Sequence, residues 1–271
     1  MAHDSDIDRG RMLAKKKMLL LLAGMCFSLL SLFTQSAQAD GLADLKAALA
    51  RLPGQTPVKA VVEAKTWGRQ GEAKDADEQH GQASISLDDS PRGLQILYSK
   101  DLLTRLETEE RAKEKDSKAK TPTIAAIKEV NSSELRPMVS AVGNLSRMLE
   151  KAIFKSEKAD ASYNGKPARL LSFEIPVEKL SEKDRKYVKK FEGSLEVWIG
   201  QDGVPLASRM HQAISGRAFV VISFETKNEE ELVYGVSGDR LVVTKKESKN
   251  SGSGAGEKGE MRVIKTLQVQ S

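Results

Sequence analysis

Cysteine is almost absent from this chain, and Cys26 is the only one in 271 residues. One cysteine cannot form an internal disulfide, and it offers no set of thiolates for a structural zinc site. The chain from residue 40 onward contains no cysteine, so its stability must come from a hydrophobic core. That part is long enough to bury a sizeable core within one large β-rich domain.

Histidine is also scarce, and only His80 and His211 lie beyond the first 39 residues. Neither has a companion at the spacing of a metal-binding motif such as H-E-x-x-H. No G-x-S-x-G elbow is present, and no cysteine remains to act as a nucleophile. A hydrolase would need a Ser–His or buried acidic constellation that the pattern does not show. We therefore predict no metal site, no cofactor and no catalytic residue, and a protein that is not an enzyme.

Aromatic residues make up only 5% of the chain. The basic clusters at 183–190 and 245–249 lack the aromatic interleaving that is typical of a face binding single-stranded nucleic acid. The formal charge of the whole chain is +5, and part of it comes from the segment before residue 40. Nucleic acid is therefore not a predicted partner.

The first 39 residues have the pattern of a secretory signal. Lys15-Lys16-Lys17 precede an apolar run from Met18 to Phe33, and Ala37-Gln38-Ala39 forms an A-x-A cleavage site. The run of about 16 residues is shorter than the roughly 20 needed to span a bilayer, which disfavours a retained anchor. We predict a cleaved signal peptide at 1–39, a mature domain at 40–271 in the periplasm, and no stable membrane span.

The most regular stretch of the sequence lies between Gly193 and Lys245, where apolar and polar residues alternate. Turn-forming segments such as Gly200-Gln201-Asp202-Gly203 and Ser237-Gly238-Asp239 interrupt the alternation. This pattern predicts an antiparallel meander. The continuous apolar run from Phe219 to Ile222 indicates a strand that is covered on both faces, so a second layer must lie across the sheet.

Apolar residues recur at helical spacing in two places. Leu42, Leu45, Leu49 and Leu52 predict an N-terminal amphipathic helix that stops at Pro53-Gly54. A longer apolar stripe predicts one continuous helix, within a helical insertion at about 100–155, that covers the meander as a lid. Its members are Leu135, Met138, Val139, Val142, Leu145, Leu149 and Ile153.

Further alternating segments flank these regions, and Asn164-Gly165 marks a tight hairpin because both residues tolerate positive φ. The Ser-Gly-Ser-Gly-Ala-Gly stretch within 246–260 predicts a flexible loop. Together the patterns predict an α+β, mainly β domain. We expect a strongly curved antiparallel half-barrel of about 10–11 strands with an N-terminal helix and a helical lid.

The segment Leu195-Glu196-Val197-Trp198-Ile199-Gly200-Gln201-Asp202-Gly203-Val204-Pro205 predicts a strand, a turn and the start of a second strand. With its export signal, N-terminal leucine helix and helical insertion, the chain resembles the periplasmic lipoprotein-carrier superfamily. That superfamily includes LolA-like, LolB-like, LppX-like and RseB-like proteins. The resemblance implies a half-barrel under a helical lid, with a hydrophobic ligand site.

A curved sheet closed by an apolar helix encloses a hydrophobic space, which is either plain core or a ligand cavity. Each methylene group gains about 0.8 kcal/mol on leaving water, so an acyl chain needs such a shield to cross an aqueous compartment. We therefore predict an exported periplasmic protein that binds a lipid or a lipoprotein acyl chain as a carrier or chaperone. The candidate ligand-binding residues lie on the sheet and the lid: Val197, Ile199, Met210, Val221, Met138, Val142 and Leu149.

The alternative prediction is an envelope protein-interaction or stress-sensing module that has no ligand. The hydrophobic space would then be core, and the charged segment from Glu178 to Lys190 would dock an envelope protein partner.

Overall fold

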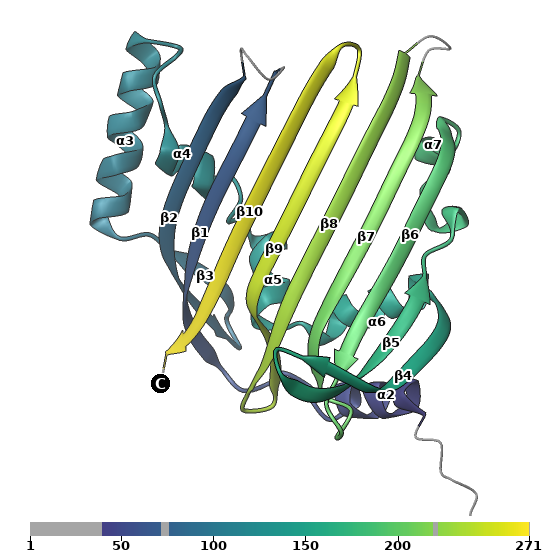
Figure 1. Cartoon of the computed structure of the whole chain (residues 1–271). Helices are drawn as coiled ribbons and strands as arrows, with labels where there is room; N and C mark the ends of the chain where they lie inside the picture. Colours follow the sequence, from purple (N-terminus) through teal and green to yellow (C-terminus); the bar gives the residue numbers. More distant parts are fainter. Residues whose placement is uncertain (1–39, 72–75, 219–221, 271) are drawn as a thin grey trace, which may run out of the picture. The chain divides into compact units, whose positions relative to one another are not determined.

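Ten antiparallel strands form one open sheet in the part of the chain that the structure describes (Figure 1). The structure is a computed structural model, and it describes residues 40–71, 76–218 and 222–270. The strand order is β3-β2-β1-β10-β9-β8-β7-β6-β5-β4, so β3 and β4 are the two edge strands. The strands are β1 (Val58–Gln70), β2 (Asp77–Ser90), β3 (Gly93–Leu97), β4 (Ile153–Tyr163), β5 (Lys166–Glu174), β6 (Val188–Ile199), β7 (Pro205–Ala218), β8 (Ile222–Ser237), β9 (Arg240–Gly254) and β10 (Glu257–Gln270).

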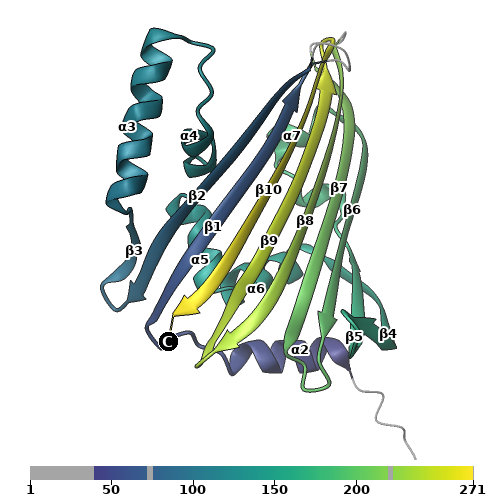
Figure 2. The ribbon, with the colours of Figure 1, turned by 60° about the vertical axis from the view of Figure 1, so that its left-hand side comes forward.

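The helices gather on one face and at the margins of this sheet. Figures 1 and 2 show α5 and α6 lying across one face, α2 across the lower end, and α3 and α4 beside β2. These elements confirm an α+β, mainly β fold that begins with an N-terminal helix. The helices are α2 (Gly41–Ala50), α3 (Lys100–Lys115), α4 (Pro122–Ile127), α5 (Ser132–Val139), α6 (Val142–Lys151) and α7 (Glu182–Arg185), with a 3₁₀ turn at Val177–Lys179.

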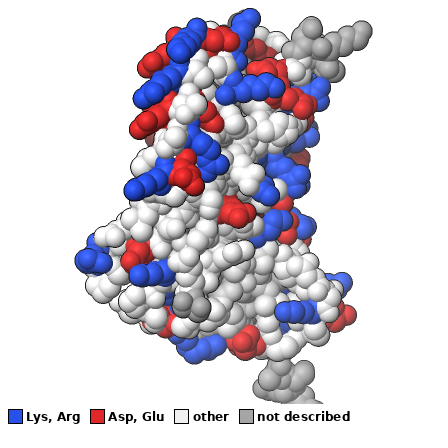
Figure 3. All heavy atoms as spheres, turned by 90° about the vertical axis from the view of Figure 1, so that its left-hand side faces the viewer, with Lys and Arg blue, Asp and Glu red and all other residues white. Residues whose placement is uncertain are grey.

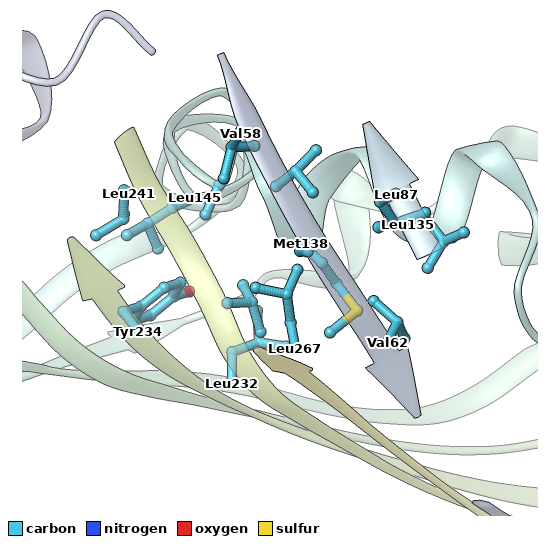
Figure 4. Packing of buried hydrophobic residues seen from close by; sticks show 14 of the residues in the cluster. Val58, Val62, Leu87, Leu135, Met138, Leu145, Leu232, Tyr234, Leu241 and Leu267 are labelled. Atoms are coloured by element: carbon cyan, nitrogen blue, oxygen red, sulfur yellow. The ribbon is translucent and has the colours of Figure 1, made fainter. Parts of the chain in front are cut away.

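Alternate residues of the strands face the helices and form the core, because successive strand side chains point to opposite faces. Figure 4 shows Met138 of α5 pointing toward Val62 of β1 and Leu267 of β10. All three side chains are buried. This part of the core therefore lies between α5 and the centre of the sheet, and the same cluster extends to α2, α6, β5 and β6.

The helical cover of the sheet, which we call the lid, consists of two helices, α5 and α6. The prediction of one continuous helix from Leu135 to Ile153 is wrong. The α5 helix ends at Val139, and α6 begins at Val142. The backbone N–H of Ala141 donates a 2.8 Å hydrogen bond to the carbonyl oxygen of Leu241 in β9, so the chain bonds to the sheet between the two helices. Ile153 is the first residue of β4 and is 51% exposed, so it is not part of the apolar stripe.

The prediction of a flexible loop at 246–260 is also wrong. These residues extend β9 and β10, which pair up to Gly254 and Glu257. Ala255 (φ 54°) and Gly256 (φ 83°) make the two-residue turn, which needs positive φ at both positions. The glycine and serine residues lie in strands that pair on both sides, so ladder hydrogen bonds hold the backbone although the side chains are small and polar.

Three sequence predictions fall wholly or mainly outside the described residues. They are the signal peptide at 1–39, the candidate ligand residue Val221 and the covering of both faces of the strand at 219–222. Among the described residues, no helix is both long and apolar enough to cross a membrane.

Candidate functional site

Three of the predicted ligand-binding residues are part of the closed core. Met138 lies in α5, and Val197 and Ile199 lie in β6, and each of these side chains is buried within the main hydrophobic cluster. Met210 of β7 is half-buried and packs against the same cluster. The hydrophobic space on the helix-covered side of the sheet is therefore filled by the protein's own side chains at these positions.

The other two described candidates, Val142 and Leu149, line an apolar groove at the α6 end of the lid. Its volume is about 450 Å³. We call it the α2–α6 groove, and it is lined by Leu42, Lys46, Leu49 and Ala50 of α2, by Val142, Ser146, Leu149 and Glu150 of α6, and by Ala152, Phe154 and Phe173.

The position of α6 follows from its apolar spacing. Leu145 is fully buried against the sheet, whereas Val142 and Leu149 lie to its side and stay half-buried. On the opposite wall, the rings of Phe154 in β4 and Phe173 in β5 meet edge to face, with centroids 5.5 Å apart. The groove thus combines aliphatic side chains from two helices with an aromatic pair from the edge of the sheet.

The start of α2 is bonded to the sheet, and these bonds fix the wall of the groove that α2 forms. The backbone N–H of Gly41 donates a 2.9 Å hydrogen bond to Oε2 of Glu157 in β4. A Cβ atom at position 41 would lie 2.8 Å from the side chains of both Glu157 and Leu171, so a larger residue would have to displace them. Asp44 forms an ion pair with the buried Arg169 at 2.7 Å, which adds a second tie to β5.

Sequence reasoning missed the α2 and phenylalanine walls of this groove. The leucine stripe of α2 was recognisable, but nothing in it indicates that Leu42 and Leu49 face α6. The signal available for Phe154 and Phe173 was their place in two segments joined by the Asn164-Gly165 hairpin, which the structure confirms as the β4–β5 turn.

A second hollow, of about 690 Å³, lies at the other end of the sheet, near the β9–β10 turn. We call it the hairpin cavity. Its floor includes Asn228 of β8, Asn250 of β9 and Met261 of β10, which are cross-strand neighbours, and Ala125 of α4 contributes to its wall. This end of the helix-covered face is therefore more polar than the part beneath α5.

A cluster of charged side chains lies between the apolar core and the hairpin cavity. Oε2 of Glu134 in α5 lies 2.7 Å from Nζ of Lys265 and 3.1 Å from Nζ of Lys246, and Lys246 Nζ is 2.8 Å from Glu230. We call these four residues the Glu134 cluster. The side chain of Lys265 is only 2% exposed.

The cluster favours the charged forms of Glu134 and Lys246. Burial by itself raises the pKa of Glu134, but the hydrogen bond from Lys265 and the charges of Lys246 and Lys265 outweigh it, so this pKa lies below its usual 4.5. Burial also opposes the charge on Lys246, yet Glu230 and Glu134 keep the pKa of Lys246 above its usual 10.5. The ion pairs thus dominate over desolvation.

The outer face of the sheet carries a different set of charges. His211 Nδ1 lies 3.6 Å from Glu229, and Arg209 contacts both Glu196 and Glu231. Among the residues that the structure describes, no three His, Cys, Asp or Glu side chains come together as a metal site would require. Figure 3 shows Lys, Arg, Asp and Glu intermixed over the face that includes α3, so this face has no single-sign patch.

The fold and the groove define a class: a mainly β α+β protein whose open sheet carries a helical cover on one face. No protein-family model matches the chain, and no curated protein matches its sequence. What the protein does must therefore be argued from its own groove and charges.

Proposed function

We propose that this chain is an exported, periplasmic protein that binds a lipid or a lipoprotein acyl chain and shields it from water as a carrier or chaperone. In this proposal the sheet acts as a half-barrel and α5–α6 as its movable lid, as in the periplasmic lipoprotein-carrier superfamily. The α2–α6 groove carries the argument. Its volume of about 450 Å³ lies in the range of roughly 300–1,000 Å³ that is usual for small-molecule pockets.

The chemistry of the groove favours an acyl chain. Its walls are mainly aliphatic and aromatic, and Lys46, Ser146 and Glu150 are the polar residues of its lining. Each methylene group that enters such a site gains about 0.8 kcal/mol, so a long chain is held without specific polar contacts.

The lid explains how a larger ligand enters. Ser140 and Ala141 join α5 to α6, and Val142 and Leu149 of α6 line the groove. In this proposal, withdrawal of α5 extends the groove along the sheet. The space vacated by the Met138 side chain then receives more of the ligand's acyl chain. In this proposal, the described conformation is the closed state.

Binding of dansyl-undecanoate, a fluorescent fatty acid, tests the proposal. We expect saturable binding to the wild type and binding weakened at least about tenfold by Leu149→Arg, which places a charge in the groove. Val236→Arg is the matched control, because Val236 is 52% exposed and does not line the groove. Native mass spectrometry of protein purified from a bacterial periplasm is the second readout. The proposal fails if that protein carries no lipid and the wild type does not bind the probe.

A protein-interaction module remains the second candidate, and one observation favours it. Leu97, Tyr98 and Leu103 are exposed and lie together where β3 leads into α3. Recovery of one stoichiometric envelope protein, lost in a Leu103→Glu variant and accompanied by no lipid, would favour this function over carriage.

A further inference from the structure

Lys265 is a charged residue at a position of β10 whose neighbours on the same face are apolar. Val263 and Leu267, two residues to either side, share its face of the sheet, and both are buried. Its cross-strand partner is Lys246 of β9, so two ammonium groups lie side by side beneath the lid. Like charges directly opposite each other in a sheet are unfavourable, and a buried charge is costly unless it is paired.

A single oxygen of α5 contacts both lysines. Oε2 of Glu134 accepts a hydrogen bond from Lys265 Nζ at 2.7 Å and lies 3.1 Å from Lys246 Nζ. Glu134 belongs to α5, whereas both lysines belong to the sheet. If α5 withdraws, Glu230 still accompanies Lys246, but one positive charge on the sheet loses its counter-ion.

The cluster lies at a boundary between two kinds of surface. On the helix-covered face, the cross-strand neighbour of Lys246 on β8 is Leu232, which belongs to the core. In the other direction along the same strands lie Asn228 and Asn250, which line the hairpin cavity. An amphiphile at this place would put its chain on the apolar side and its headgroup beside the lysines.

We propose that the Glu134 carboxylate occupies the place of the ligand's headgroup, so that the ligand is an amphiphile with an anionic head, which Lys246 and Lys265 bind when α5 withdraws. This inference rests on the proposed carrier function and names the chemical class of its ligand. In the protein without ligand, the carboxylate of Glu134 pairs with the two lysines. When the ligand binds, its carboxylate or phosphate takes the place of Glu134. Charge balance beneath the lid is thereby kept in both states.

The test compares two ligands that differ only in their headgroup. Hexadecanoate and hexadecanol compete for dansyl-undecanoate on the full chain, and we expect hexadecanoate to bind at least about tenfold more tightly to the wild type. Lys265→Met and Lys246→Met should each bring this ratio close to one. Lys245→Met is the matched control and should leave the ratio unchanged, because Lys245 lies on the opposite face of β9 and contacts Glu247.

Glu134→Gln separates a headgroup mimic from an ordinary ion pair. Because this change removes the internal competitor, the open state becomes more populated, and hexadecanoate should bind several-fold more tightly while the headgroup ratio persists. Acetate, which has the carboxylate without the chain, should not displace the probe at the same concentration; displacement would assign the site to a small anion and overturn the inference.

The remaining outcomes are equally decisive. Equal binding of the acid and the alcohol to the wild type overturns the headgroup assignment while leaving a carrier in place. An unchanged ratio in both folded lysine variants, checked by circular dichroism, also overturns it. If neither amphiphile binds the wild type, the carrier function itself fails.

Discussion

Arg240 and Asp89 form a buried ion pair, in which Nη1 of Arg240 donates a 2.6 Å hydrogen bond to Oδ2 of Asp89. The same guanidinium donates to the carbonyl oxygen of Val139 at 3.3 Å and to the carbonyl oxygen of Thr56. Arg240 opens β9, Asp89 is near the end of β2, and Val139 is the last residue of α5. One side chain therefore joins two strands, the lid and the chain segment that precedes β1.

Arg240→Met should destabilise the protein strongly. Removing one partner of a buried ion pair leaves the other charged and unpaired, which costs about 3–5 kcal/mol of the free energy of unfolding. Arg209→Met is the control, because Arg209 is 50% exposed and its ion pairs are worth about 0–1 kcal/mol. Urea denaturation of both variants measures the difference. Equal losses in the two variants would show that Arg240 is not a structural junction.

Met138→Ala should reveal how closely the lid is packed. Met138 is buried between α5 and the sheet, so its truncation leaves a cavity and should lower the free energy of unfolding by about 2–5 kcal/mol. Val236→Ala, at an exposed site on β8, should change it by less than about 0.5 kcal/mol. Chemical denaturation again provides the measurement, and a loss below about 1 kcal/mol for Met138→Ala would mean that the lid is loosely packed.

The Glu134 cluster predicts a specific loss of stability in acid. The pKa of Glu134 is lowered in the folded protein, so its contribution is fully present above the ordinary pKa of 4.5 and is lost as pH falls through the lower folded value. The wild type should therefore exceed Glu134→Gln in free energy of unfolding at pH 7, and the gap should narrow by about pH 3. Urea unfolding at the two pH values measures the gap; a gap that stays constant would contradict the prediction.

Two glycines should respond in opposite ways to alanine. A Cβ atom at Gly81 would clash with the hydroxyl of Thr66 and lie 2.6 Å from the carbonyl oxygen of Pro122, so Gly81→Ala should push α4 away from β2. We expect a loss of about 1–3 kcal/mol by thermal or urea unfolding. Gly143 of α6 has open space around its Cβ position, so Gly143→Ala should be neutral or stabilising by up to about 1 kcal/mol. A similar loss from both changes would argue against the close α4–β2 contact.

Local patterns predicted much of the fold correctly. The leucine spacing after residue 41 predicted α2, and Asn164-Gly165 predicted the β4–β5 hairpin, because caps, turns and amphipathic spacing act between residues that are close in sequence. The same reasoning joined α5 and α6 into one helix. The stripe of apolar residues continues through Ala141, but the backbone leaves the helix at Ser140 (φ −152°, ψ 86°), and the N–H of Ala141 bonds to Leu241 in β9.

The candidate site was predicted only in part, for a related reason. Val142 and Leu149 face the groove, whereas Met138, Val197 and Ile199, which have the same apolar character, are closed within the core. Hydrophobicity and spacing cannot distinguish a residue that faces a groove from one that faces another side chain. That difference depends on which element lies opposite.

The amino-acid sequence by itself determined the alternation of inward and outward residues, the turns and the helical faces, because these depend on neighbours along the chain. Only the tertiary structure decided that Lys265 is buried against Glu134, 131 residues away in the sequence, and that α2 and α6 leave an apolar groove between them. Such contacts depend on how distant segments pack together. A charged residue on a buried apolar face is stable only when it has a partner of opposite charge, and tertiary packing determines which residue that partner is.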